Sequence, residues 1–149
     1  MRLIQHDRWG VYIRDIRPIG SVIRTRDLDG TDQLEFTALT DVSKGDRVVA
    51  VDSMGRVCEW EVSSVDAVRE DGAPALDVAC VAGYGELSLA WIDEKQNTGY
   101  SAASCLAKAL DGTRWTAGEC ESGTLASTAT TSWYHESVSD ALEFDYQSD

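Results

Sequence analysis

The feature that most constrains the fold is the alternation of apolar and polar residues over residues 33–39. Leu34, Phe36 and Ala38 fall on one side of an extended chain, and the more polar residues between them fall on the other. A period of two is the pattern of a β-strand with one buried face. The segment therefore predicts a strand in a sheet that covers a core on one side.

Two further runs predict a hairpin directly after this strand. Residues 47–52 are rich in valine, residues 53–56 are turn-forming, and residues 57–65 alternate so that Trp60 and Val62 face inward. Further strands are expected at residues 11–16, 21–25 and 75–82. Short strands at this spacing are typical of a small antiparallel barrel or sandwich.

The pattern changes after Gly85. Ala103, Leu106, Ala107 and Leu110 recur at helical spacing on one face, and this predicts a helix over residues 102–110 with Ala103, Leu106 and Leu110 facing the β-domain. Ser101 suits its N-cap and Gly112 its end, and a second helix start is expected at Ser137-Val-Ser-Asp140. A short strand is expected at residues 115–119 and a loop at residues 121–132. We therefore expect a β-dominated α+β fold, with an antiparallel domain at residues 1–85 and a short αβ segment at residues 86–149.

Charge limits the classes of partner. The 149 residues include 13 basic and 26 acidic side chains, which gives a net charge of −13. Such a surface repels phosphate, so nucleic acid and anionic membranes are poor partners. The sequence has no apolar run near the ~20 residues of a membrane span and no signal-peptide core, so we expect synthesis in a reducing cytoplasm.

The sequence indicates neither a metal nor a cofactor. Its cysteines form no Cys-x-x-Cys pair, and they stand at positions 58, 80, 105 and 120. Only His6 and His135 could join them as zinc ligands, so free thiols are favoured, with Cys58 and Cys80 on inward strand faces.

No catalytic residue is predicted. The glycines of Gly83-Tyr-Gly85 lack the lysine of a phosphate-binding loop, and Ser101 is better explained as a helix cap than as a nucleophile. Glu35, Glu59 and Glu61 fall on outer strand faces, where solvation is the ordinary role of a carboxylate.

The tryptophans divide into two groups. Trp60 and Trp115 fit core positions, because Trp60 lies on an inward strand face and Trp115 follows a helix end. The others have no assigned core register and are candidate interface residues together with a neighbouring tyrosine: Trp9, Trp91, Trp133 and Tyr134.

Four segments, in order along residues 16–142, resemble the N-terminal region of the tail-associated ("minor structural", often "tail endopeptidase") proteins of siphophages and prophages. They are Leu28-Asp-Gly-Thr-Asp-Gln-Leu-Glu-Phe-Thr37, Lys44-Gly-Asp-Arg-Val-Val with Glu59-Trp-Glu-Val62, Ser101-Ala-Ala-Ser-Cys-Leu-Ala-Lys-Ala-Leu-Asp-Gly-Thr-Arg-Trp-Thr-Ala-Gly118, and Glu136-Ser-Val-Ser-Asp-Ala-Leu142. This region is similar in fold to the baseplate hub protein of contractile phage tails.

The resemblance implies a non-catalytic module of a virion tail tip, made from a phage or prophage gene and involved in host attachment. The implied partners are other copies, as a trimer in the full-length assembly, and distal tail or tail-tube proteins. The family continues well beyond the position of Asp149, so the chain is expected to be a fragment or a truncated gene product, and a monomeric state of the fragment stays open. Two alternatives also stay open: a cell-wall hydrolase or endopeptidase domain, and a carbohydrate-binding β-domain.

Overall fold

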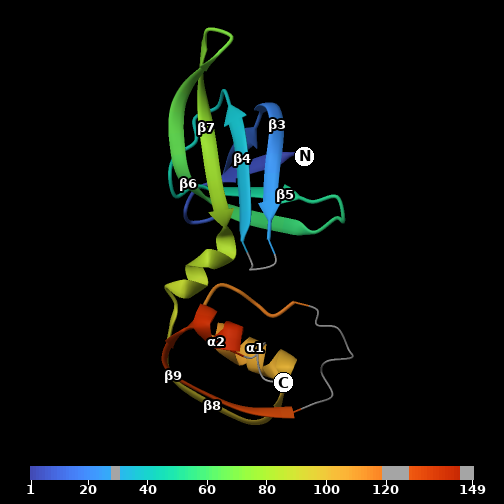
Figure 1. The fold of residues 1–149 in the computed structure, drawn as a ribbon, viewed down its shortest axis with the longest axis vertical. Helices are drawn as coiled ribbons and strands as arrows, with labels where there is room; N and C mark the ends of the chain where they lie inside the picture. Colours follow the sequence, from blue (N-terminus) through green and yellow to red (C-terminus); the bar gives the residue numbers. More distant parts are fainter. Residues whose placement is uncertain (28–30, 119–127, 145–149) are drawn as a thin grey trace. The chain divides into compact units, whose positions relative to one another are not determined.

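The computed structural model describes residues 1–27, 31–118 and 128–144. Chain contacts divide the protein into two compact units, residues 1–84 and residues 85–149, and each is described by itself (Figure 1). Strands dominate the first unit, and two strands and two α-helices make up the described part of the second. The predicted β-dominated α+β class is confirmed.

The first unit is one antiparallel sheet of seven strands in the order β2-β1-β5-β6-β7-β4-β3. Its strands are β1 Leu3–His6, β2 Tyr12–Ile16, β3 Pro18–Arg26, β4 Asp32–Ala38, β5 Arg47–Val51, β6 Val57–Glu70 and β7 Ala73–Ala82.

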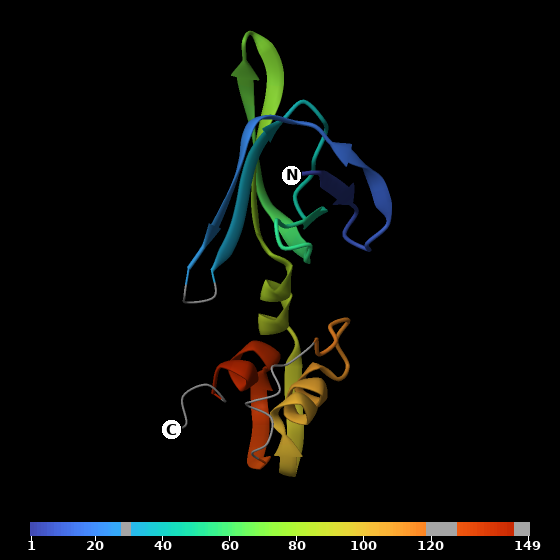
Figure 2. The ribbon, with the colours of Figure 1, turned by 90° about the vertical axis from the view of Figure 1, so that its right-hand side faces the viewer.

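The sheet bends so that its two edges approach each other at one point. β2 and β3 are the opposite edges, yet only Arg17 separates them in the chain. Figure 2 shows the resulting curvature, with β3 and β4 across the core from the N-terminal strands. The expected barrel is nevertheless not closed, because β2 and β3 do not pair. One linking residue is too short for a β-hairpin, and Pro18 has no N–H to donate to a ladder.

The core of this unit lies on the concave face. Leu34, Phe36 and Ala38 of β4 are all buried, as the alternation predicted, and Trp60 is only 1% exposed. The predicted hairpin is confirmed as β5 and β6, with Val48 opposite Trp60. The remaining core residues come from most of the other strands and the segment after β4: Leu3, Ile16, Val42, Val48, Ala50, Val62, Val78 and Cys80.

The β6–β7 hairpin contains two local irregularities. A bulge at Ser63 shifts the register between Val62 and Ser64, and the Ser63 hydroxyl donates to the Ala79 carbonyl over 2.9 Å. At the tip, Asp71 and Gly72 have φ angles of 49° and 81°, the left-handed conformations that a tight two-residue hairpin turn requires.

The second unit is built on a two-stranded antiparallel sheet. A 3₁₀ helix, η1 Gly83–Ser88, runs across the boundary between the units, and β8 Trp91–Ser101 pairs with β9 Thr128–Ser137. Two helices, α1 Ala102–Leu110 and α2 Val138–Phe144, pack with the strands. Their shared core contains Leu87, Ile92, Cys105, Ala109, Leu110, Trp133, Val138 and Ala141.

Helix α1 has the predicted bounds and cap, and its buried face is partly the predicted one, since Leu110 is buried and Leu106 packs half-buried against the core. The Ser101 side chain accepts a hydrogen bond from the Ser104 amide at 3.3 Å. Ala107, expected to be inward, is exposed, whereas Cys105 and Ala109 are buried against the unit's own core. Packing against β8, β9 and α2 turns the buried face toward Cys105 and Ala109, which helical spacing of the larger apolar residues did not indicate.

Two other expectations for this unit are wrong. Residues 115–118 are not a strand, and residue 119 lies outside the described residues. Residues 128–132 belong to β9, not to a loop, because pairing with β8 overrides their Ser/Thr/Ala-rich composition; residues 121–127 lie outside the description. The predicted cap at Ser137 is confirmed, since its hydroxyl accepts from the Asp140 amide at 3.1 Å and donates to the Asp140 carboxylate.

Candidate functional site

The described residues include no group of three or more His, Cys, Asp or Glu side chains that could hold a metal ion. Cys80 and Cys105 are buried free thiols, and Cys58 is a half-buried one. Cys120 lies outside the described residues. Ser101 caps α1 as expected. The Glu59 carboxylate forms an ion pair with the Arg47 guanidinium at 3.0 Å.

A buried charged group in the first unit joins three strands. Asp32 of β4 receives two hydrogen bonds from the guanidinium of Arg24 in β3 and one from Trp60 Nε1 of β6 at 3.0 Å. The Arg24 guanidinium also lies 4.8 Å from the centre of the Trp60 ring, within cation–π range. Burial opposes the charge of Asp32, but the bonds from Arg24 and Trp60 outweigh it and hold the pKa of Asp32 below its usual value.

Asp52, in the turn between β5 and β6, is held in its charged form by similar means. The backbone amide and side chain of Arg56 both donate to its carboxylate, and the Met54 amide adds a third bond. These bonds lower the pKa of Asp52 to about 2. Asp32 and Asp52 are therefore fixed anions that stabilise the fold, which is the opposite of what a general acid needs at neutral pH.

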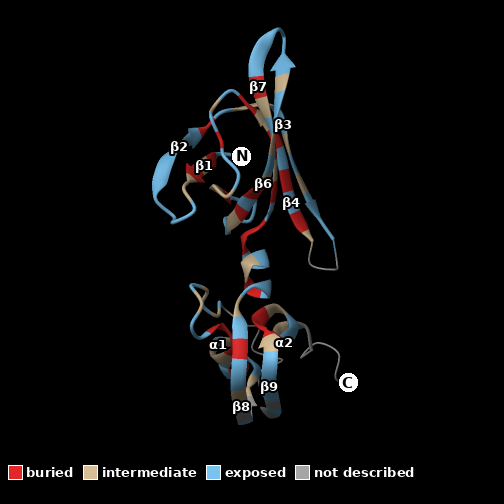
Figure 3. Cartoon of the chain, turned by 90° about the vertical axis from the view of Figure 1, so that its left-hand side faces the viewer, coloured by how far each residue is buried: buried red, intermediate tan, exposed pale blue. Residues whose placement is uncertain are grey.

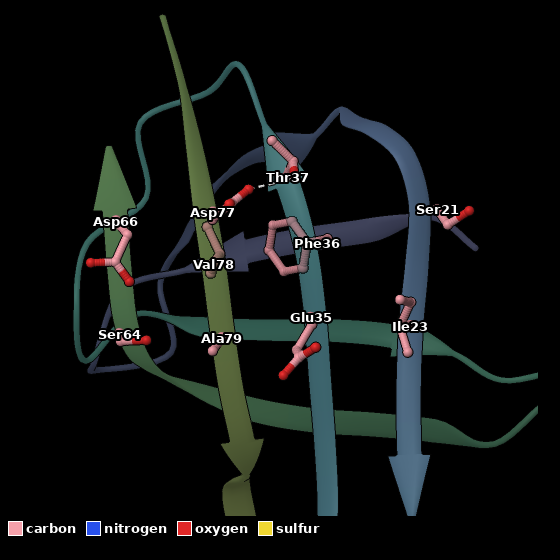
Figure 4. A pocket seen from close by; sticks show the side chains of 10 residues that line it. All are labelled: Ser21, Ile23, Glu35, Phe36, Thr37, Ser64, Asp66, Asp77, Val78 and Ala79. Carbon is pink, nitrogen blue, oxygen red and sulfur yellow. Dashed lines mark hydrogen bonds between the residues drawn. The ribbon is translucent and has the colours of Figure 1, made fainter. Parts of the chain in front are cut away.

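An acidic groove of about 340 Å³ runs over the outer face of β3, β4, β6 and β7 (Figure 4). Glu35, Asp66 and Asp77 are its carboxylates, and Thr37 donates to Asp77 Oδ1 over 2.6 Å. Ile23 lines the same groove and is 55% exposed. The groove combines negative charge with apolar surface, and its open carboxylates lie away from the buried core.

A second groove, of about 510 Å³, carries the opposite charge. Arg8, Lys44 and Arg47 line it, together with Gly45 and Glu61. Arg47 is held in place, because its Nε donates to the Arg8 carbonyl at 3.1 Å and its Nη1 to Glu59. Such clustered cations suit carboxylate or phosphate groups of a partner.

Three of the four aromatic residues proposed as interface candidates are exposed. Trp9, Trp91 and Tyr134 are 82%, 62% and 66% exposed. Trp133 is only 4% exposed and belongs to the core of the second unit, so treating it as a surface side chain was wrong. Polar neighbours hid its register, which pairing with Lys95 of β8 fixes. Trp115 is half-buried against the same core, and its Nε1 donates to Glu86.

The β1–β2 hairpin presents an apolar surface that sequence reasoning missed. Its turn is organised by Asp7, whose Oδ1 accepts from the amides of Trp9 and Val11 at 2.8 Å each. Val11 and Tyr12 are 62% and 58% exposed, and β2 is exposed almost along its whole length (Figure 3). The sequence pattern indicated an ordinary strand here, and only the topology shows that this strand is an edge.

Comparison with solved structures places this architecture among known folds. The chain superposes on a prophage tail protein, gp18, from Listeria monocytogenes EGD-e with a TM-score of 0.66 and 12% sequence identity, covering 97% of this chain and 44% of that one. It superposes on a tail protein from Neisseria meningitidis MC58 with a TM-score of 0.58 and 15% identity, covering 95% and 43%. The chain shares the fold of phage tail proteins.

The tail-protein fold accounts for nearly the whole chain, and the chain spans less than half the length of either solved tail protein. No protein-family model and no curated protein sequence matches it. Within the described residues, no helix is long and apolar enough to cross a membrane.

Proposed function

We propose that the protein is a structural module of a phage or prophage tail tip. In this role it joins the tail tube or distal tail protein to the machinery of host attachment, as a hub or adaptor, and it has no catalytic activity of its own. The observation that carries the proposal is the superposition of at least 95% of the chain on each of two tail proteins.

The chemistry of the described residues supports an assembly role. The two best-buried carboxylates, Asp32 and Asp52, are held charged by fixed partners, and the described residues contain no metal-ligating cluster. The surface instead offers exposed aromatic side chains, notably Trp9 and Trp91, of the kind that anchor protein–protein interfaces.

The alternative functions have weaker support. A wall hydrolase requires a nucleophile with a base, or an acid–base pair in a cleft that keeps one carboxyl protonated. The acidic groove brings Glu35, Asp66 and Asp77 together, but on the open outer face of the sheet rather than in an enclosed apolar cleft. A carbohydrate-binding domain usually stacks sugars on aromatic rings, and neither the acidic groove nor the basic groove is lined by tryptophan.

The proposal is tested by binding and by activity on the same preparation. The purified chain is titrated with a distal tail protein from the same phage or prophage genome, and in parallel incubated with peptidoglycan. We expect a saturable complex and no soluble wall fragments. Release of fragments that is abolished by one point substitution would replace the structural role with a hydrolase.

A matched pair of variants sharpens the binding assay. Trp91→Ser and Tyr134→Ser remove exposed aromatic residues of the second unit, and Met54→Ser removes an exposed apolar side chain of the first that we assign to no interface. We expect at least one aromatic variant to bind more weakly than the wild-type chain, and the Met54 variant to bind as tightly as the wild-type chain. If both aromatic variants bind as tightly as the wild-type chain, Trp91 and Tyr134 are not part of the interface.

A further inference from the structure

Charge is distributed very unevenly along this acidic chain. Residues 1–16, which contain β1 and β2, carry three arginines and two aspartates, a net charge of +1, so residues 17–149 carry a net charge of −14. The β1–β2 hairpin therefore lacks the acidic excess of the other residues, and Arg8 in its turn joins Lys44 and Arg47 in the basic groove. This cluster of cations attracts the acidic surface of another copy.

The hairpin beside this groove also exposes apolar side chains. The β1–β2 hairpin exposes Trp9, Val11 and Tyr12, and Trp9 is 82% exposed. Beside them, Arg8 and Lys44 line the basic groove and make no ion pair with another described residue. Exposed aromatic groups next to unpaired cations are a surface built to meet an apolar, acidic counterpart.

The acidic groove over β3, β4, β6 and β7 has the complementary character. Glu35 and Asp66 are exposed and have no ion pair with a described residue, and Ile23 supplies exposed apolar area between the carboxylates and the sheet edge. The groove thus offers negative charge and apolar contact in the same place.

The two surfaces lie on different strands of the sheet. The hairpin occupies the β2 edge, and the groove covers the last four strands toward the β3 edge. One copy can therefore offer its hairpin to one neighbour and its groove to another. Such a head-to-tail contact produces a closed ring when the rotation between copies closes and a filament when it does not.

We propose that the β1–β2 hairpin of one copy docks on the acidic groove of a second copy, with Trp9 against Ile23 and with Arg8 and Lys44 facing Glu35 and Asp66. This inference rests on the proposed assembly role and identifies the two surfaces that meet. The occupant is another copy because the chain itself carries the matching charge and apolar area.

The test is sedimentation equilibrium of the full chain over a range of concentrations at low salt and at about 0.5 M salt, where surface charges are screened. We expect concentration-dependent association that salt weakens. Trp9→Ser should raise the dissociation constant roughly tenfold or more, as loss of a central aromatic anchor does. Met54→Ser, on an exposed turn of the same unit, is the matched control and should leave it unchanged.

Charge exchange identifies the partner surface. The double variants R8E/K44E and E35K/D66K should each be monomeric, and their equimolar mixture should associate again, because each then supplies one intact surface to the other. All four positions are exposed, so circular dichroism should show both variants folded. A monomeric wild-type chain at every concentration, or association that survives E35K/D66K, would overturn the proposal.

Binding of the distal tail protein is measured on the same variants to separate this inference from the proposed function. A chain that binds this protein but never self-associates refutes only the hairpin–groove contact. A chain that self-associates as described but does not bind refutes the adaptor role and keeps the contact.

Discussion

Trp60→Phe should destabilise the first unit by about 3 kcal/mol. Trp60 is 1% exposed, and its Nε1 donates to Asp32 at 3.0 Å. Loss of a hydrogen bond to a charged group costs about 1.5–3 kcal/mol, and the smaller ring leaves a void that adds about 1 kcal/mol. The weaker attraction of Arg24 for a phenyl ring contributes a further few tenths.

A double-mutant cycle isolates the hydrogen bond from the void. In an Asp32→Asn background the acceptor has already lost its charge, so Trp60→Phe should cost only about 1–2 kcal/mol. The coupling between the two positions is then at least about 1 kcal/mol.

The assay is urea unfolding followed by far-UV circular dichroism, which does not depend on the replaced tryptophan. Trp91→Phe is the control, because this side chain is 62% exposed and should change the free energy of unfolding by less than about 0.5 kcal/mol. An equal cost of Trp60→Phe with and without Asp32→Asn would refute the role given to the hydrogen bond.

Three further predictions follow from the same contacts. Because hydrogen bonds hold the pKa of Asp52 at about 2, below its unfolded value of ~3.9, its stabilisation should be complete above about pH 4 and be lost toward pH 2; urea midpoints across this range check it, and Asp52→Asn should flatten the profile. Burial raises the pKa of the Cys80 thiol to about 12, so mass spectrometry should show alkylation of Cys80 at pH 8 on the order of a thousandfold slower than of an ordinary thiol until the unit unfolds. Ser137→Ala removes the acceptor of the Asp140 amide and should cost about 1 kcal/mol in a thermal melt, whereas Ser139→Ala, which leaves that cap intact, should not.

Sequence patterns predicted the structure where one period ran without interruption. The alternation around Phe36 and the hairpin that carries Trp60 were correct in register, because burial of one strand face fixes both. The capping side chains Ser101 and Ser137 were also found, since a cap depends only on residues within one turn.

The patterns failed where distant pairing decides. β8 and β9 pair across a gap of 26 residues, so nothing local indicates that Trp133 lies in a core. The candidate interface was incomplete for the same reason: Val11 and Tyr12 look like ordinary strand residues, and only the order of the strands makes β2 an edge. The Arg24–Asp32–Trp60 contact brings together three strands that no spacing in the sequence connects.

The single residue between β2 and β3 also has a kinetic consequence. β1 must find β5, with Leu3 opposite Ala50, and this is the pairing of longest sequence separation on that side of the sheet. Arg17 holds the β1–β2 hairpin close to the body of the sheet once β3 has joined β4, so the hairpin searches for β5 at a high effective concentration. Cleavage of the backbone at Arg17 would leave every ladder hydrogen bond in place. It would also make the hairpin a dissociable strand pair, whose return to β5 depends on its concentration in solution.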